Sequence, residues 1–261
     1  MTFFGYTLYK YQKDVILIGK NEERFELISD EILKQLKSIP TQTLIDGLWV
    51  KGWPTSYVEG ALPLQEGQNM AGRAVTLRFV PHRPDLAEDK PKGVDSAEYV
   101  AFELCGPGEV IVIDAMGWKY SSIGGDIKFL RLMQRRVGGL VTDGGVRDSK
   151  ALKQYGFPVY SASLTAKQGP ADFWPWQVND AIQCGKVLVR PGDAVVGDDD
   201  GVVIVPQSEV EDVIRIAQER EEVEEVIKEQ LNVENCSPGK YYPFNDETWR
   251  LFESKGGRRK I

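Results

Sequence analysis

GGDIKFLRLMQRRVGGLVTDGGVRD, residues 124–148, reads as a glycine turn, an amphipathic helix, a buried strand and a second glycine turn. The apolar residues after Gly124-Gly125 recur at helical spacing, and the strand is predicted over residues 140–142. The second turn is predicted over residues 143–148. If the helix and the strand run antiparallel, both turns lie at the same end of the layer. Asp126, Arg147 and Asp148 can then converge, which predicts a compact site for an anion and a metal ion.

Outward from this stretch, helical patterns alternate with short apolar runs, which is typical of an α/β layer. The run at residues 110–113 is unbroken and predicts a strand covered on both faces, whereas residues 73–80 alternate and predict a half-buried strand. Residues 81–94 are predicted to form an exposed loop. Further helices are expected over residues 31–39, 95–105, 149–155 and 209–231 and after a cap at Thr41, with strands over residues 158–161 and in hairpins between residues 186 and 206.

The composition limits the classes of function. The formal net charge of −7 and the lack of a long basic cluster argue against nucleic-acid binding, which depends on neutralising phosphates. No apolar run is long enough to cross a bilayer and no signal peptide is recognisable, so we expect a soluble cytoplasmic protein. The three cysteines lie in no ligand pattern and the single histidine, His82, excludes a histidine-based triad or a multi-histidine metal site within one chain.

Each residue at the two turns has a structural alternative. Gly124-Gly125 can aim backbone N–H groups at a carboxylate or phosphate beside the helix dipole, or can simply form a tight turn. Asp126 is a favourable acid in the first turn of a helix, and Asp148 is a candidate N-cap for the helix that begins at Ser149. Joint placement favours function, because carboxylates suit Mg²⁺ or Mn²⁺ and the fork of Arg147 suits a small carboxylate substrate.

The spacing of these residues resembles a known enzyme family. Asp126, twenty intervening residues and then Arg147-Asp148 resemble the motif of class II pyruvate aldolases, which cleave 4-hydroxy-4-methyl-2-oxoglutarate and 4-carboxy-4-hydroxy-2-oxoadipate. Those enzymes share their fold with the RraA regulators of ribonuclease E. The resemblance extends from about Ile39 to Pro206 and includes the segments PTQTLIDGL, LPLQEGQNMAGRAVTLRFV, PGEVIVIDAMG and RPGDAVVGDDDGVVIVP.

The resemblance implies a fold and its boundaries. We expect a layered α/β domain of the RraA type, similar to the swivelling phosphohistidine-domain fold, at residues 29–206. Residues 1–28 would be an N-terminal extension. Within it, residues 1–23 mix aromatic and charged side chains and are expected to form an extra hairpin or an arm on a neighbouring subunit. Residues 207–261 would be a C-terminal helix with an aromatic tail that packs on its own or a neighbouring subunit.

The resemblance also implies roles for residues. Asp148 would be the direct ligand of a divalent cation, Mg²⁺ or Mn²⁺, and Asp126 would hold one of its waters, which would serve as the base or proton shuttle. Arg147 would bind the pyruvyl group and steady the enolate, while residues Gly125, Asp126, Ile127 and Lys128 would contact substrate through backbone amides. The site would lie between subunits of a homotrimer or homohexamer and could be completed by a neighbour's acid. Residues 198–200 are one candidate source of that acid, and the alternative is that they form only a polar hairpin loop.

The predicted activity is that of a metal-dependent carbon–carbon lyase acting on a small 2-oxo acid, releasing pyruvate through a metal-stabilised enolate, with oxaloacetate decarboxylation beside it. Lys128 stands where the resemblance leads us to expect a small or apolar residue. We therefore expect the Lys128 side chain to account for a substrate that differs from those of the relatives. Two alternatives remain at this stage. One is an RraA-like regulator that inhibits ribonuclease E without a metal, although regulators of that kind lack the full Arg147-Asp148 pair; the other is a catalytically silent oligomeric scaffold.

Overall fold

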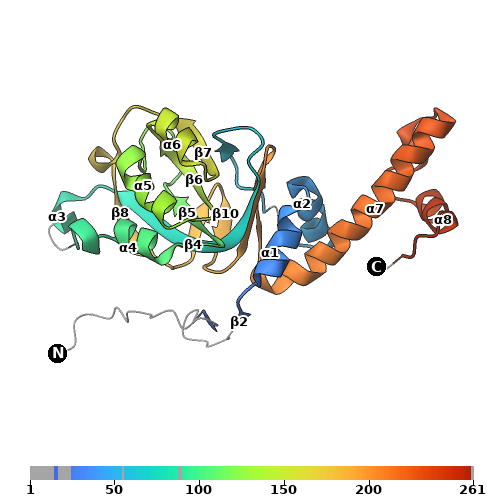
Figure 1. Ribbon diagram of the computed structural model, residues 1–261, viewed down its shortest axis with the longest axis horizontal. Helices are drawn as coiled ribbons and strands as arrows, with labels where there is room; N and C mark the ends of the chain where they lie inside the picture. Colours follow the sequence, from blue (N-terminus) through green and yellow to red (C-terminus); the bar gives the residue numbers. More distant parts are fainter. Residues whose placement is uncertain (1–14, 17–24, 55, 88–89, 260–261) are drawn as a thin grey trace.

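A mixed eight-stranded sheet forms the body of the chain in a computed structural model that describes residues 15–16, 25–54, 56–87 and 90–259 (Figure 1). The strand order is β12-β11-β4-β5-β6-β7-β3, with β8 also paired to β4. Strands β4 to β7 are parallel neighbours, and the others join antiparallel. The strands are β3 (Leu62–Pro63), β4 (Met70–Pro81), β5 (Glu109–Asp114), β6 (Gly139–Val146), β7 (Val159–Leu164), β8 (Phe173–Val178), β11 (Ala194–Asp198) and β12 (Gly201–Val205).

The remaining elements surround this sheet. Two short ladders lie outside it, β1 (Val15–Ile16) with β2 (Phe25–Glu26) and β9 (Ile182–Cys184) with β10 (Val187–Val189). The rest of residues 1–23, where a hairpin or arm was predicted, lies outside the described residues. The helices are α1 (Asp30–Lys37), α2 (Thr41–Val50), α3 (Pro84–Ala87), α4 (Ala97–Leu104), α5 (Asp126–Gln134), α6 (Ser149–Tyr155), α7 (Val210–Glu234) and α8 (Asp246–Ser254).

Strand β5 is apolar along its length because both of its faces are buried. Ile111 and Ile113 face one core cluster together with Phe102 of α4 and Phe129 of α5. The alternate residue Val112 faces a second cluster, which includes residues of β9 to β12. Successive side chains of a strand point to opposite faces, so both faces of β5 are covered and the predicted buried strand is confirmed.

Strand β4 is longer and more buried than predicted. The strand predicted at residues 73–80 is confirmed within β4, but its polar face is not in water throughout, because Thr76 on that face is fully buried. The segment after β8 covers that face, and the Thr76 hydroxyl donates to the carbonyl of Asp180 at 2.7 Å. At Thr76, the alternation of polar and apolar residues therefore reflects a polar contact inside the protein and not exposure to water.

Strand β6 continues through the predicted second glycine turn. The strand was expected to end at Thr142, yet it runs to Val146 with all residues buried and a register irregularity between Thr142 and Gly145. Glycine is required there by close packing: a Cβ on Gly144 would lie 2.5 Å from that of Ala115. The turn is therefore confined to Arg147 and Asp148.

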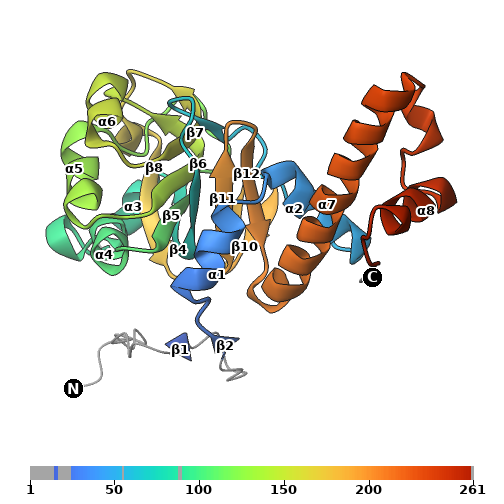
Figure 2. The ribbon, with the colours of Figure 1, turned by 45° about the vertical axis from the view of Figure 1, so that its right-hand side comes forward.

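Strands β11 and β12 have helices on one face. On that face α1, α2 and α7 share an apolar cluster with the two strands (Figure 2). The predicted cap at Thr41 is wrong, because Thr41 is the first helical residue and its amide and hydroxyl both donate to Asp198, at 2.9 and 2.8 Å. Asp198 thus fixes the start of α2 from the β11–β12 hairpin.

The C-terminal tail packs on its own chain. Helix α7 extends beyond the sheet and α8 lies beside its distal half (Figure 1). Tyr241 and Phe252 are buried against Val223 and Ile227 of α7. This arrangement confirms one of the two outcomes predicted for the aromatic tail.

The segment predicted as an exposed loop, residues 81–94, contains α3 and one turn of 3-10 helix at Gly93–Asp95, and residues 88–89 are outside the described set. Among the helices of the described segments, none is both long and apolar enough to cross a membrane.

Candidate functional site

The two turns of the opening motif meet at the carboxyl end of β6. The Arg147 amide donates to the carbonyl of Gly124 at 3.1 Å, and the Asp126 amide donates to Oδ2 of Asp148 at 3.1 Å. The predicted convergence of Asp126, Arg147 and Asp148 is therefore present. All three line an open cavity of about 1020 Å³.

Gly125 lets the two turns approach this closely. A Cβ on Gly125 would lie 2.3 Å from Oδ2 of Asp148 and 2.7 Å from Cγ of Arg147. The φ of Gly125 is −165°, which any residue can adopt, so glycine is required here for space and not for backbone conformation.

Asp148 does not cap α6 with its side chain. Its backbone is left-handed, with φ 58° and ψ 37°, whereas a capping residue is usually extended, and its carboxylate makes no hydrogen bond to the first turn of α6. The carboxylate turns toward α5 instead, where Oδ2 accepts from the Asp126 amide and lies 3.4 Å from Nε of Arg147. Within the described residues Oδ1 has no partner, and the side chain is 42% exposed.

Asp126 has a comparable arrangement. The Tyr155 hydroxyl, at the end of α6, donates to Oδ1 of Asp126 and lies 3.3 Å from its carbonyl oxygen. No described residue contacts Oδ2 in a hydrogen bond or ion pair. Each of the two carboxylates thus has one oxygen held by the protein and a second oxygen available to a ligand.

Arg147 offers its guanidinium to the same space. The side chain is 43% exposed, and its one ion pair within the described segments joins Nε to Asp148. The two Nη groups can donate in parallel to a carboxylate, a geometry for which the planar guanidinium is suited.

The first turn of α5 supplies backbone donors to the cavity, and the side chain of Lys128 in that turn points elsewhere. Because the first N–H groups of a helix have no intrahelical partner, the amides of Ile127 and Lys128 remain available beside the cavity. The Lys128 ammonium is directed to α4, where Nζ lies 2.6 Å from Glu98 Oε2. The apolar residues that recur along this helix were expected on one buried face, but the side chain of Ile127 is 80% exposed.

The opposite wall of the cavity was not predicted. It consists of the residues that follow β7 together with Ser122, and Ser122 forms parallel bridges to Gly145 and Gln168. The signal available in the sequence was indirect. Consecutive parallel strands place their carboxyl ends side by side, so the segment after β7 belongs next to the segment after β6. Tyr155 was also missed.

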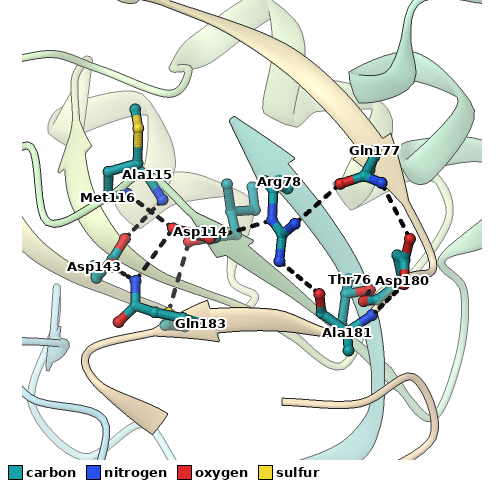
Figure 3. Close-up of polar contacts among 12 residues, drawn as sticks. Thr76, Arg78, Asp114, Ala115, Met116, Asp143, Gln177, Asp180, Ala181 and Gln183 are labelled. Carbon is teal, nitrogen blue, oxygen red and sulfur yellow. Dashed lines mark hydrogen bonds and ion pairs between the residues drawn. The ribbon is translucent and has the colours of Figure 1, made fainter. Parts of the chain in front are cut away.

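A second pair of aspartates lies inside the protein, between β5 and β6 (Figure 3). Gln183 Nε2 donates to both, 3.2 Å from Asp114 and 3.0 Å from Asp143, and Arg78 Nε lies 3.6 Å from Asp114. Burial, and secondarily the charge of Asp143, raises the pKa of Asp114 above its usual range. Backbone amides complete the coordination of Asp143, namely those of Ala115, Gly117 and Gly185. This pair is therefore a structural cluster that holds loops together.

The acidic hairpin at residues 198–200 lies away from this cavity. It follows β11, which pairs with the start of β4, so it projects from the amino end of the parallel strands. Asp198 is engaged by Thr41, and Oδ1 of Asp199 accepts from the Gly67 amide at 2.7 Å. Of the three residues, Asp200 alone has a carboxylate with no partner among the described residues.

No group of three or more His, Cys, Asp or Glu side chains within the described segments is arranged to hold a metal ion. A cation at the cavity would therefore depend on Asp148, with water and ligand atoms filling the other positions. Such a donor set suits magnesium or manganese, which keep several waters when bound to protein.

Comparison with known proteins places this geometry in a family. A family model described as "RraA-like: Aldolase/RraA" matches residues 41–204. The chain belongs to the RraA-like family. That family includes proteins named as aldolases and proteins named as inhibitors of ribonucleases.

Individual relatives agree with this assignment. A protein of Halalkalibacterium halodurans named "Putative 4-hydroxy-4-methyl-2-oxoglutarate aldolase" is 32% identical, over 73% of this chain and 84% of the relative. The crystal structure of Streptomyces coelicolor RraAS2, titled an unusual member of the RNase ES inhibitor RraA protein family, is similar with a TM-score of 0.69 and 30% identity, over 77% of this chain and 97% of that one.

A structure from Pseudomonas syringae pv. tomato, with a TM-score of 0.69 and 21% identity, covers 82% of this chain and 98% of its own and shows the shared fold. The predicted α/β fold of the RraA type, with a long C-terminal helix, is confirmed by these matches.

Proposed function

We propose that this RraA-like protein is a divalent-metal-dependent lyase that cleaves a 4-hydroxy-2-oxo acid and releases pyruvate. The observation that carries the proposal is the carboxylate of Asp148. It is turned away from its own helix, held at one oxygen by the Asp126 amide, and open to the cavity at the other beside Arg147. Similarity to a relative named as an aldolase supports the same conclusion.

The chain's residues divide the work. Arg147 binds the carboxylate of the 2-oxo acid through its Nη groups, and the amides of Ile127 and Lys128 assist at the positive end of α5. Asp126 holds the water that accepts the proton of the 4-hydroxyl group. As the bond between C3 and C4 breaks, the new carbonyl forms at C4, the electron pair becomes a pyruvate enolate, and protonation at C3 yields pyruvate.

A divalent cation, Mg²⁺ or Mn²⁺, fits the open oxygen of Asp148, because carboxylate and water oxygens are the donors that these ions prefer. When bound, it supplies Lewis-acid stabilisation of the charge that develops on the 2-oxo group. Loss of carbon dioxide from oxaloacetate gives the same enolate, so the proposal includes oxaloacetate decarboxylation.

The active unit is proposed to be a homotrimer or homohexamer. Ile127 and Leu164 line the cavity with side chains 80% and 56% exposed, which favours coverage by a second copy. A neighbouring copy could add an acid to the cavity, and the available carboxylate of Asp200 makes it the preferred candidate in residues 198–200.

A coupled pyruvate assay tests the proposal. Oxaloacetate and a panel of 4-hydroxy-2-oxo acids are supplied with Mg²⁺, and each reaction is repeated with a chelator. We expect pyruvate from at least one substrate, lost with chelation and restored by added metal. Failure of every substrate to yield metal-dependent pyruvate would remove the lyase proposal.

Inhibition of ribonuclease E by protein contact is the second candidate, favoured by the similarity to RraAS2. Ribonuclease activity titrated with this protein, with and without a chelator, distinguishes the two. Metal-independent inhibition without pyruvate release would support the regulator.

A further inference from the structure

Tyr155 joins the far end of α6 to the first residue of α5. Its ring packs at the edge of the main apolar cluster, and its hydroxyl reaches both the Oδ1 and the carbonyl oxygen of Asp126. The contact spans 29 positions of the sequence and lies beside the cavity. Nothing in the proposed division of work uses this side chain.

The hydrogen bond restricts a carboxylate that would otherwise turn freely. Asp126 is the first residue of α5 and is only partly buried, so the helix itself leaves its side-chain torsions open. A donor fixed to Oδ1 selects one orientation. That orientation leaves Oδ2 as the oxygen that can receive a hydrogen bond from a water or a substrate hydroxyl.

The hydroxyl of Tyr155 stays a donor throughout the neutral range. Its hydrogen bond to Asp126, with burial and the charges of Asp126 and Asp148 adding to it, raises the pKa of Tyr155 above its usual value near 10. Loss of the tyrosine proton would place a phenolate beside the carboxylate of Asp126, so the proton stays on the Tyr155 hydroxyl.

We propose that Tyr155 is a positioning residue of this site, holding Asp126 so that Oδ2 alone faces the cavity and orders the proton-accepting water. The inference rests on the proposed lyase function. A structural alternative is that Tyr155 only ties α6 to α5, and the two roles predict different behaviour when the hydroxyl is removed and the ring is kept.

Steady-state kinetics of Tyr155→Phe separate these roles. For a positioning residue we expect kcat to fall about 10- to 100-fold with KM nearly unchanged, as when other supporting hydrogen bonds around a site are lost. Tyr160→Phe is the matched control, because the Tyr160 hydroxyl donates to the Gln68 carbonyl at 2.6 Å, away from the cavity. The control should lower the Tm by roughly 2–4 °C and leave kcat unchanged.

A second readout needs neither substrate nor metal. Carbon-13 NMR of the tyrosine Cζ atoms follows the titration of Tyr155, which should occur above pH 10 in the wild type and shift toward 10 in Asp126→Asn. Titration of Tyr155 at its usual pH in the wild type would show that the hydrogen bond is absent and overturn the inference.

The remaining outcomes are also decisive. If the wild type is active and Tyr155→Phe retains its kcat while losing thermal stability, Tyr155 is a structural tie and the inference is wrong. If the wild type releases no pyruvate while the NMR titration shows the hydrogen bond, the lyase proposal has failed and the positioning role fails with it.

Discussion

Two pairs of aspartates lie within one sheet and do different things. Asp114 and Asp143 sit on adjacent strands, where backbone amides, Gln183 and Arg78 engage their oxygens (Figure 3). Asp126 begins α5 and Asp148 follows β6, and each keeps one oxygen without a partner in the described part of the chain. A carboxylate with every oxygen satisfied stabilises the fold, whereas a held but incompletely satisfied carboxylate is prepared for a ligand.

The largest expected effects come from replacing one aspartate of each pair with asparagine. Asp148→Asn should lower kcat at least about 10³-fold, because several kcal/mol of charge stabilisation depend on that ligand, while the free energy of unfolding changes little. Asp143→Asn places an NH₂ group against backbone donors and should cost roughly 3–5 kcal/mol of stability.

Chemical denaturation and pyruvate release, measured on both variants, test this contrast. A stable Asp143→Asn protein together with an unfolded Asp148→Asn protein would reverse the assignment of the two pairs.

The next largest loss of activity is expected from Gly125→Ala, which crowds Oδ2 of Asp148. The methyl group of Gly125→Ala would meet Oδ2 at 2.3 Å and displace both Asp148 and Arg147. A misplacement of that order costs about 10²-fold in kcat/KM. Gly106→Ala is the matched control, since its Cβ would meet no atom closer than 3.7 Å, and it should retain activity. Equal activities in the two variants would mean that the close approach of the turns is dispensable.

A third buried carboxyl extends the comparison to pH. Burial raises the pKa of Asp193 from 3.8 to about 6, although the amides of Arg190 and Gln207 oppose the rise. The folded state therefore binds this proton more tightly than the unfolded state. Its stabilisation is complete below about pH 3.8 and is lost as pH rises through 6, a change of about 3 kcal/mol.

Asp193→Asn resembles the protonated acid at every pH, which gives the measurement its reference. Denaturation of both proteins between pH 4 and 7 should show the wild type losing most of this stabilisation of about 3 kcal/mol relative to the variant. If the free energies of unfolding of the two proteins change in parallel with pH, ionisation of Asp193 does not destabilise the folded state and the prediction is wrong.

The smallest expected effect is at Lys128. Because its ammonium pairs with Glu98, Lys128→Met should change kcat/KM by less than about threefold and cost roughly 1–3 kcal/mol of stability, as Glu98 is left buried without its partner. A changed order of preference among 2-oxo acids would instead restore the sequence-based hypothesis that this side chain selects the substrate.

The sequence predicted the convergence of Asp126, Arg147 and Asp148 because short-range patterns carried it. A glycine turn, a helix and a strand within 25 residues leave few ways to return the chain to its starting edge. The extent of β6 was missed because Gly144 and Gly145 resemble turn residues, and only the approach of Ala115 and Lys119 explains them inside a strand. The role of Tyr155 depends on how α5 and α6 pack, which no local periodicity encodes.

Binding of Mn²⁺ measured by electron paramagnetic resonance tests the central claim most directly, because it asks whether the open oxygen of Asp148 holds a cation without requiring the substrate to be known. In the presence of pyruvate, the wild type and Asp143→Ser, at a temperature where both are folded, should each bind about one Mn²⁺ per chain, and Asp148→Asn should bind none. Binding by Asp148→Asn at wild-type affinity would contradict the account.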